Sequence, residues 1–245
     1  MNGFLTMSMQ DSGALGRNSH DIVTPDGCLI RAFIQARMNS ARFPGKVLVP
    51  LNGKPVIAHV VSQAARIIPL DHITVATSEA VSDDPLATYA QSLGVPVFRG
   101  ALDSVFERFQ LCLKEFPCDW FFRICADSPL LDSSLLKSML VYAERPDIDL
   151  VTNVQVRTFP KGHSAEMLKA STFARIDASR LSADEKEHVT AIYYRHPERF
   201  SIINIKAARP ERAIESFAVD TLQDLERLEK ILGDDKASLK ASLPA

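Results

Sequence analysis

Residues 29–36 read LIRAFIQA, and residues 37–46 directly after them read RMNSARFPGK. The first segment is mainly apolar with β-branched side chains, which is typical of a buried strand, whereas the second carries two arginines, a lysine and a Pro-Gly turn. Residues 54–68 then place apolar side chains at helical spacing. This order of strand, polar loop and helix is typical of an α/β fold, and it predicts that the basic loop follows the carboxyl end of the strand.

The same alternation continues along the chain. Short apolar strands are predicted over residues 73–77, 95–98, 120–125 and 148–152, and amphipathic helices over residues 84–93, 104–116 and 133–143. Parallel neighbouring strands need crossover connections, and helices supply them on both faces of a sheet. The sequence therefore predicts a Rossmann-like, doubly wound, mostly parallel sheet, with ligands outside the carboxyl ends of the strands.

The regular alternation of predicted strands and helices ends after residue 153. Extended pieces are predicted over residues 154–159 and 164–168, helical stretches near residues 171–179 and 183–195, strands over residues 201–205 and 216–219, and a final helix from Leu222. We interpret residues 29–245 as one domain with an inserted substrate or dimerisation arm at about residues 154–200. Residues 1–28 are predicted to be a mobile extension.

Composition limits the classes of function. The 245 residues are 46% hydrophobic and 24% charged with a formal net charge of −2, so no overall field attracts nucleic acid or an anionic membrane, and an anion site must be local. The sequence shows no secretory leader and no apolar run long enough for a membrane span, which predicts a cytoplasmic protein. The four cysteines form no C-x-x-C pair and are expected to be buried thiols in a reducing compartment, with a disulfide or metal set as the alternative.

The basic loop is a candidate phosphate site. A Walker loop needs a glycine where Ser40 stands and a hydroxyl residue where Val47 follows Lys46, so the loop is not a conventional P-loop. Arg37 and Arg42 can each fork onto phosphate oxygens, and Lys46 can supply a point charge. The alternative is a solvated loop with three surface cations.

Two aspartates follow predicted strands far apart in the sequence. Asp127 comes just after the strand at 120–125, and Asp220 comes just after the one at 216–219. Mg²⁺ is commonly held by one or two carboxylates together with substrate phosphates, so this pair is a candidate metal site. The alternative for Asp220 is the N-cap of the final helix.

Several motifs occur in a fixed order along residues 30–230: Gln35-Ala36-Arg37, Ser40, Arg42, Pro44-Gly45-Lys46, Val75-Ala76-Thr77-Ser78, Val97-Phe98-Arg99-Gly100, Asp127-x-Pro129-Leu130 and Val219-Asp220-Thr221. Together they resemble the cytidylyltransferase family that activates acidic 2-keto sugars, the CMP-Kdo and CMP-sialate synthetases. The segments Pro160-Lys161-Gly162 and Glu187-His188-Val189-Thr190 add a similarity to the spore-coat polysaccharide type.

The resemblance implies a Mg²⁺-dependent transfer of CMP from CTP to the anomeric hydroxyl of an acidic sugar, with release of pyrophosphate and for surface polysaccharide biosynthesis. It also implies that the fold is of the nucleotide-diphospho-sugar transferase type, and that a homodimer forms through residues 154–200. Its implied catalytic residues are Lys46, Arg37 and Asp127, and its implied metal ligands are Asp127 and Asp220. The residues implied to hold the nucleotide are Ala36, Arg37, Ser40, Arg42 and Lys46 at the triphosphate, and Thr77, Ser78, Arg99 and Gly100 at the nucleoside.

The resemblance also implies a sugar side. There Arg123 or Lys161 would pair with the sugar carboxylate, and Glu166, Glu187 and His188 would bond its hydroxyl or N-acyl groups. The alternatives are a salt bridge for Glu187 and a packed core histidine for His188.

Two departures from the family pattern concern the sugar side alone. Ser164 stands where relatives often carry an acid, and Ala191 stands where they often carry a proline. Two alternative functions remain for the protein. It could be a nucleotidyltransferase that acts on a sugar 1-phosphate or another alcohol, or a nucleotide-binding protein without catalytic activity.

Overall fold

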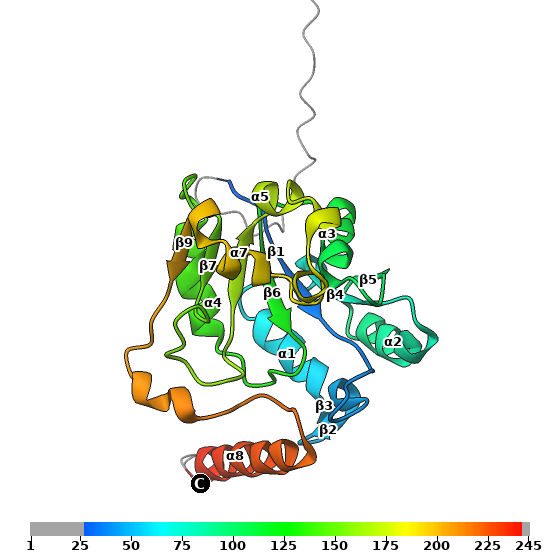
Figure 1. Cartoon of the computed structure of the whole chain (residues 1–245). Helices are drawn as coiled ribbons and strands as arrows, with labels where there is room; N and C mark the ends of the chain where they lie inside the picture. The colour runs from blue at the N-terminus through cyan, green and yellow to red at the C-terminus, as the bar shows by residue number, and fades with distance from the viewer. Residues whose placement is uncertain (1–26, 242–245) are drawn as a thin grey trace, which may run out of the picture.

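A seven-stranded sheet forms the centre of the computed structural model, which describes residues 27–241 (Figure 1). The strand order is β5-β4-β1-β6-β8-β7-β9. The strands are β1 (Ile30–Gln35), β4 (Ile73–Ser78), β5 (Val97–Gly100), β6 (Trp120–Cys125), β7 (Leu150–Thr152), β8 (Glu166–Lys169) and β9 (Ile202–Asn204). The extension predicted over residues 1–28 lies almost wholly outside the described residues.

The sheet is mostly parallel, as the sequence predicts. β1 pairs in parallel with β4 on one side and β6 on the other, β4 pairs in parallel with β5, and β7 with β9. Only β8 runs the other way, between β6 and β7. The carboxyl ends of β1 and β6 therefore lie at the same edge, which brings the loops that follow them together.

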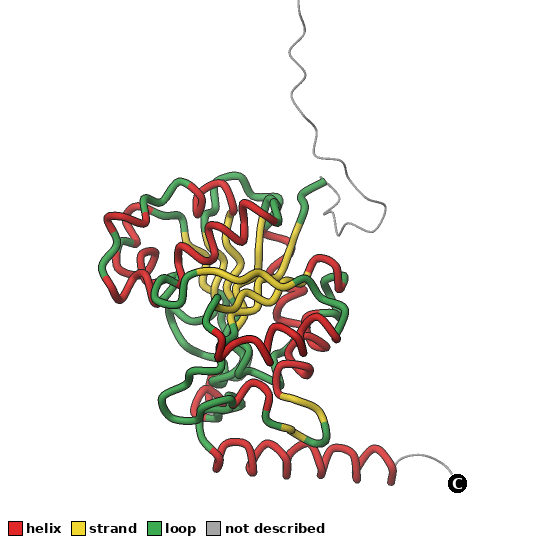
Figure 2. The backbone as a smooth tube through the Cα atoms, turned by 90° about the vertical axis from the view of Figure 1, so that its right-hand side faces the viewer, coloured by secondary structure: helices red, strands yellow, loops and turns green. Residues whose placement is uncertain are grey.

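Helices cover both faces of the sheet, as Figure 2 shows. Alternate side chains of β1 explain this: Ile30, Ala32 and Ile34 belong to one apolar cluster, whereas Phe33 belongs to the other and stacks on Phe121 with ring centroids 5.0 Å apart. The first cluster includes apolar residues of α1 (Val56–Ala64), α2 (Asp84–Ser92) and α4 (Ser133–Met139). The second includes those of α3 (Val105–Glu115), α5 (Ala170–Ala174) and α7 (Ala191–Arg195), and α6 (Ala183–Glu187) contacts α3.

Residues 154–200 were expected as an inserted arm, and they contribute to the body of the sheet. Their strand β8 lies inside it, and their helices α5 to α7 join α3 on one face. The extended conformation predicted over 154–159 is wrong: residues 154–157 form turns, because the Thr152 hydroxyl accepts a hydrogen bond from the Val154 N–H (3.1 Å) and reverses the chain.

The prediction missed a small hairpin next to the basic loop. β2 (Pro50–Leu51) and β3 (Lys54–Pro55) pair around Asn52-Gly53, whose φ angles of 51° and 82° are those of a type I′ turn. The helix predicted from residue 54 consequently begins only at α1. Apolar residues of the final helix α8 (Leu222–Ala241) pack against this hairpin, so that α8 lies along the lower edge of the molecule in Figure 1.

Gly162 lets the chain before α8 reach the edge of the sheet. Its φ is +93°, and a Cβ there would lie 2.4 Å from the carbonyl carbon of Phe217. The strand predicted over 216–219 is wrong, because this segment forms only an isolated bridge: Phe217 N–H donates to the carbonyl of Lys161 (2.6 Å), and Val219 N–H donates to the carbonyl of Asp127 (2.8 Å). The close approach at Gly162 thus places residue 220 beside residue 127.

The Gly162→Ala substitution tests this placement. We expect it to lower the free energy of unfolding by about 2–4 kcal/mol, because two costs add. The new Cβ would clash with backbone atoms, and alanine, unlike glycine, is strained in the left-handed conformation. Gly94→Ala is the matched control, since Gly94 has a φ of +78° with no atom within 4 Å of a built Cβ. We expect the control to lose only about 1 kcal/mol in urea unfolding. Equal losses in the two variants would contradict the close approach.

Candidate active site

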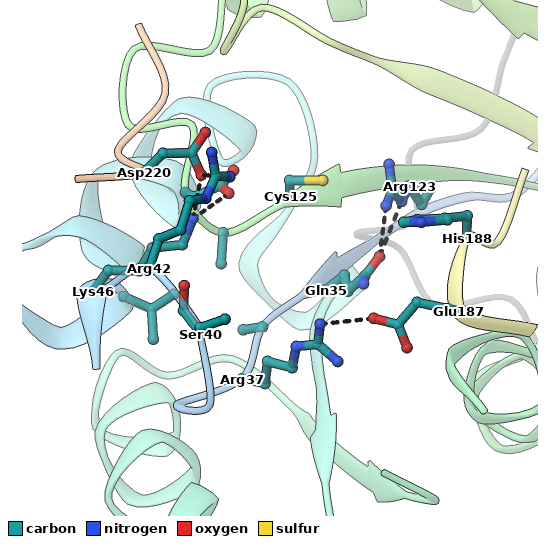
Figure 3. Close-up of a pocket in the computed structure, with 15 residues that line it drawn as sticks. Gln35, Arg37, Ser40, Arg42, Lys46, Arg123, Cys125, Glu187, His188 and Asp220 are labelled. Atoms are coloured by element: carbon teal, nitrogen blue, oxygen red, sulfur yellow. Dashed lines mark hydrogen bonds and ion pairs between the residues drawn. The ribbon is translucent and has the colours of Figure 1, made fainter. Parts of the chain in front are cut away.

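The basic loop and the two aspartates line one pocket of about 390 Å³ at the carboxyl ends of β1 and β6 (Figure 3). The loop side contributes Gln35, Ala36, Arg37, Ser40, Ala41, Arg42, Lys46 and Val47. The opposite side contributes Arg123, Cys125, Ala126, Asp127, Glu187, His188 and Asp220. The structure therefore confirms that segments separated by as many as 174 residues meet at this edge of the sheet.

Lys46 joins the two aspartates. Its Nζ lies 2.7 Å from Oδ2 of Asp127 and 2.9 Å from Oδ1 of Asp220. Asp220 also accepts from Arg42 at 2.9 Å and from Lys161 at 2.5 Å, so three cations share this one carboxylate. The site thus holds more positive than negative charge around Asp220, which suits a polyanion.

The charges of this cluster are stabilised by one another. Burial alone would lower the pKa of Lys46, but attraction and hydrogen bonds from Asp127 and Asp220 raise it above its ordinary value. Burial alone would raise the pKa of Asp220, but hydrogen bonds and charge from Lys161 and Lys46 lower it to about 2. Both groups therefore remain charged at neutral pH, and the Asp220 contribution to stability would be lost only as the pH falls from about 4 through about 2.

The conformation of the basic loop depends on the peptide groups of Met38. Its carbonyl accepts from the N–H groups of Ser40 (3.0 Å) and Gly45 (2.8 Å), and its own N–H donates to Oδ1 of Asp83 (2.7 Å). Gly45 closes this loop with a φ of +72°. Lys46 follows directly and is directed into the pocket in Figure 3.

Asp83 is a buried carboxylate that sequence reasoning missed. Besides Met38 it accepts from the hydroxyl of Thr77 (3.0 Å) and from the N–H (3.1 Å) and hydroxyl of Ser78. Burial alone would raise its pKa, but hydrogen bonds, first from Ser78 and then from Met38, lower it. The only available signal was an acid just before a helix, which also predicts an ordinary helix cap, and no such cap is formed here.

The residues implied to border the nucleoside lie behind the pocket. Thr77 and Ser78 are fully buried against Asp83, and neither lines the pocket. Arg99 donates to the carbonyls of Ser78 and Ala80 (both 2.9 Å) and pairs with Asp84, while Gly100 lies against the stem of Arg108. The structure thus connects Thr77 and Ser78 to the basic loop through Asp83 and does not bring these four residues into the pocket.

A second pocket of about 470 Å³ adjoins the first. Residues shared by both pockets form the wall between them: Arg42, Arg123, Cys125, Asp127, His188 and Asp220. The second pocket also includes Lys161 and Glu166, two residues implied for sugar binding, and Ser164 and Ala191, the two departures. The implied nucleotide and sugar sides are therefore neighbouring spaces that meet at Asp127 and Asp220.

Arg123 is held by a network across the sheet. Its Nη1 donates to Glu166 (3.1 Å) on the neighbouring strand, and its Nη2 and Nε donate to Oε1 of Gln35 (2.7 and 3.2 Å). Glu166 in turn accepts from the hydroxyl of Tyr194 at 2.5 Å, and this hydroxyl lies 2.8 Å from that of Thr152. Burial would lower the pKa of Arg123, but the surrounding acidic groups raise it. Gln35 and Tyr194 are site residues that the sequence did not single out.

The alternatives for Glu187, His188 and Asp220 are resolved by position. Glu187 pairs with Arg37 at 2.7 Å and lines only the first pocket, as the salt-bridge alternative predicts. The side chain of His188 is 64% exposed, so it is not a core histidine. Asp220 does not cap α8: the hydroxyl of Thr221 accepts from the N–H of Asp224 (3.2 Å), and the Asp220 carboxylate binds cations instead.

Cys112, Cys118 and Cys125 are free thiols, as predicted. The predicted burial holds for Cys112, whereas Cys28, Cys118 and Cys125 are half-buried. Cys125 lines both pockets, and burial raises its pKa to about 11, against the opposing charge of Arg123. It is therefore a neutral thiol at physiological pH.

The donor set of Asp127 and Asp220 fits a magnesium ion bound jointly with phosphate. One ammonium already bridges the two carboxylates, so a cation between them is compatible with their positions, and carboxylate oxygen is a preferred ligand of Mg²⁺. No group of three or more His, Cys, Asp or Glu residues suited to a metal occurs among residues 27–241. The remaining ligands would therefore come from the substrate phosphates and water.

A basic loop and paired carboxylates at the carboxyl ends of parallel strands define an α/β protein with a charged site at the edge of its sheet that suits a phosphorylated ligand. The family model described as cytidylyltransferase matches residues 32–242, and the chain belongs to this family.

Relatives agree with this membership. The chain is 31% identical over 208 residues to the spore coat polysaccharide biosynthesis protein SpsF of Bacillus subtilis (strain 168). This alignment covers 81% of this chain and 84% of that protein. The chain is 27% identical over 242 residues to the 3-deoxy-manno-octulosonate cytidylyltransferase of Bdellovibrio bacteriovorus, covering 81% of this chain and 96% of that protein.

A solved cytidylyltransferase from Leptospira borgpetersenii has the same fold. Its TM-score is 0.76 at 23% identity, with 88% of this chain and 98% of that chain covered. The Rossmann-like nucleotidyltransferase fold expected from the sequence is thereby confirmed. No helix within residues 27–241 is long and apolar enough to cross a membrane.

Replacing Asp83 tests whether it positions the basic loop. We expect Asp83→Ala to lower the free energy of unfolding by about 1–3 kcal/mol, because four donor groups lose their acceptor, and to weaken nucleotide binding. The matched control is Asp84→Ala, since Asp84 is the neighbouring carboxylate and pairs with Arg99 on the surface. Urea unfolding and calorimetric titration with CTP measure both effects. An Asp83→Ala protein with the CTP affinity of the control would show that the loop needs no such anchor.

Proposed function

We propose that this protein is a cytoplasmic cytidylyltransferase that transfers CMP from CTP to the anomeric hydroxyl of an acidic 2-keto sugar, with release of pyrophosphate, for surface polysaccharide biosynthesis. The observation that carries the proposal is the junction of the two pockets. The cations suited to a triphosphate lie in one, polar and charged groups suited to a sugar acid line the other, and Asp127 and Asp220 belong to both.

The chain's own groups would act mainly by position and charge. Arg37, Ser40 and Arg42 would bind the phosphates from the loop side of the first pocket. Lys46 would face the charge that develops when the sugar hydroxyl attacks the α-phosphate and pyrophosphate departs. Because Lys46 is 8% exposed, its charge acts in a largely water-free surrounding, where such contacts are stronger.

We further propose that Mg²⁺ is the cofactor and that Asp127 and Asp220 hold it. The ion would neutralise phosphate charge and lower the pKa of a bound hydroxyl. Lys161 and Arg42 already balance Asp220, so they would remain available to the phosphates when the carboxylate binds a metal.

The name of the Bdellovibrio relative supports a sugar acid, and that of the Bacillus relative supports a polysaccharide pathway. The two alternative functions are transfer to a sugar 1-phosphate or another alcohol, and nucleotide binding without catalysis.

A sugar 1-phosphate acceptor would place a further phosphate in the second pocket, which we call the sugar-side pocket. Nucleotide binding without catalysis would need no charged junction between two pockets.

The experiment is pyrophosphate release from CTP, UTP, GTP and ATP with Mg²⁺ and a panel of acceptors. The panel contains 3-deoxy-manno-octulosonic acid, N-acetylneuraminic acid, related nonulosonic acids and glucose 1-phosphate. We expect release with CTP and at least one sugar acid. A preference for UTP or GTP, or for the sugar phosphate, would favour the first alternative, and no release with any pair would contradict catalysis.

Substitutions at the junction should affect turnover. We expect Lys46→Gln and Asp127→Asn to reduce kcat by about 10² or more, because one well-placed charge contact contributes roughly 3–4 kcal/mol at the transition state. Lys54→Gln is the control, since Lys54 is exposed on β3 outside both pockets. Wild-type kcat in both junction variants would move the reacting centre elsewhere.

We also propose a homodimer, which the family resemblance implies for residues 154–200. Val156 in this segment is 52% exposed, and β9, which follows the segment, is the last strand of the sheet. An exposed edge and apolar side chains of this kind need cover. Multi-angle light scattering should give the mass of two chains, and Val156→Asp should lower it. The mass of one chain at working concentration would contradict the dimer.

A further inference from the structure

Four cations line the sugar-side pocket, and three of them already have carboxylate partners. Arg42 and Lys161 pair with Asp220, at 2.9 and 2.5 Å, and Arg123 pairs with Glu166 at 3.1 Å and is also bound by Gln35. The fourth cation is Arg157. Among residues 27–241 no carboxylate pairs with it, and its one hydrogen bond goes to the hydroxyl of Ser164 at 3.3 Å.

The loop that carries Arg157 and Ser164 is held at both ends. Asn153, which is only 1% exposed, donates to the carbonyl of His163 (2.7 Å) and accepts from the N–H of Ala165 (2.9 Å), so it ties the start of the loop to its end. The N–H of Val156 donates to the side chain of Asn204 at 2.9 Å. Arg157 is therefore a solvent-exposed cation on a fixed rim of the pocket.

From this arrangement we propose that Arg157, next to Ser164, binds the carboxylate of the acceptor sugar and so selects sugar acids over neutral sugars. The inference rests on the proposed transfer to a sugar acid and names its recognition residue. Guanidinium matches a carboxylate in a planar, two-pronged geometry, and the Ser164 hydroxyl can donate to the same group. Of the four cations that line this pocket, Arg157 is the one that can engage a ligand without giving up an ion pair to a carboxylate of residues 27–241.

Arg123 and Lys161, which the family resemblance implied as partners of the sugar carboxylate, would each have to give up an ion pair to bind it. Freeing Arg123 would leave Glu166, whose side chain is 3% exposed, as a buried charge without its cation. Lys161 binds Asp220 at 2.5 Å, so it would have to give up this ion pair to engage a sugar carboxylate. Arg157 requires neither rearrangement.

The test compares the best sugar acid of the panel above with its C1 amide, which keeps the sugar and removes the negative charge. In the wild type we expect kcat/KM to be higher for the acid. Arg157→Gln should lower kcat/KM for the acid by about 30- to 100-fold, change it little for the amide, and leave the Kd for CTP unchanged. Ser164→Asp should act like Arg157→Gln, because it gives Arg157 a permanent carboxylate partner, whereas the matched variant Ser164→Asn should retain the preference for the acid.

Each result decides one question. If the wild type releases pyrophosphate with no sugar acid, the proposed function fails and this inference fails with it. If the wild type is active and Arg157→Gln keeps its preference for the acid, only the assignment of Arg157 is overturned. Loss of that preference in Lys161→Gln instead would move the carboxylate contact to Lys161.

Discussion

The ammonium of Lys46 between Asp127 and Asp220 is the interaction on which the site depends. The two carboxylates follow segments far apart in the chain, and without a cation between them they would repel each other in a partly buried place. Two backbone features make the meeting possible: the left-handed Gly45 turns the basic loop toward the pocket, and Gly162 allows the segment before α8 to approach the edge of the sheet. The position of this ion group fixes where the two pockets join.

The remaining site charges divide into two sets by their partners. Cations around Asp220 exceed the negative charge available there, which suits a triphosphate, whereas Arg123 belongs to a closed network with Gln35 and Glu166. Arg157 belongs to neither set. This division assigns different tasks to side chains of the same charge, and proximity alone would not separate them.

Local patterns predicted much of this. Apolar runs identified the strands β1, β4, β5, β6 and β7, and the basic loop and both aspartates were recognised because each follows the end of an apolar segment. What could not be predicted depends on contacts between distant residues. β8 is short and amphipathic, so its place inside the sheet follows from pairing with β6 and β7. The burial of Thr77 and Ser78, and the role of Asp83 beneath the loop, likewise depend on packing that a linear pattern does not encode.

The most direct measurement is a crystal structure with Mg²⁺ and a CTP analogue whose α,β-bridge cannot be cleaved. The account predicts the triphosphate against the loop of residues 37–46, with its α-phosphate at the junction next to Lys46, Asp127 and Asp220, and with the sugar-side pocket open beside it. A triphosphate bound away from Lys46, or one that fills the pocket of Arg157 and Glu166, would contradict the assignment of the two pockets.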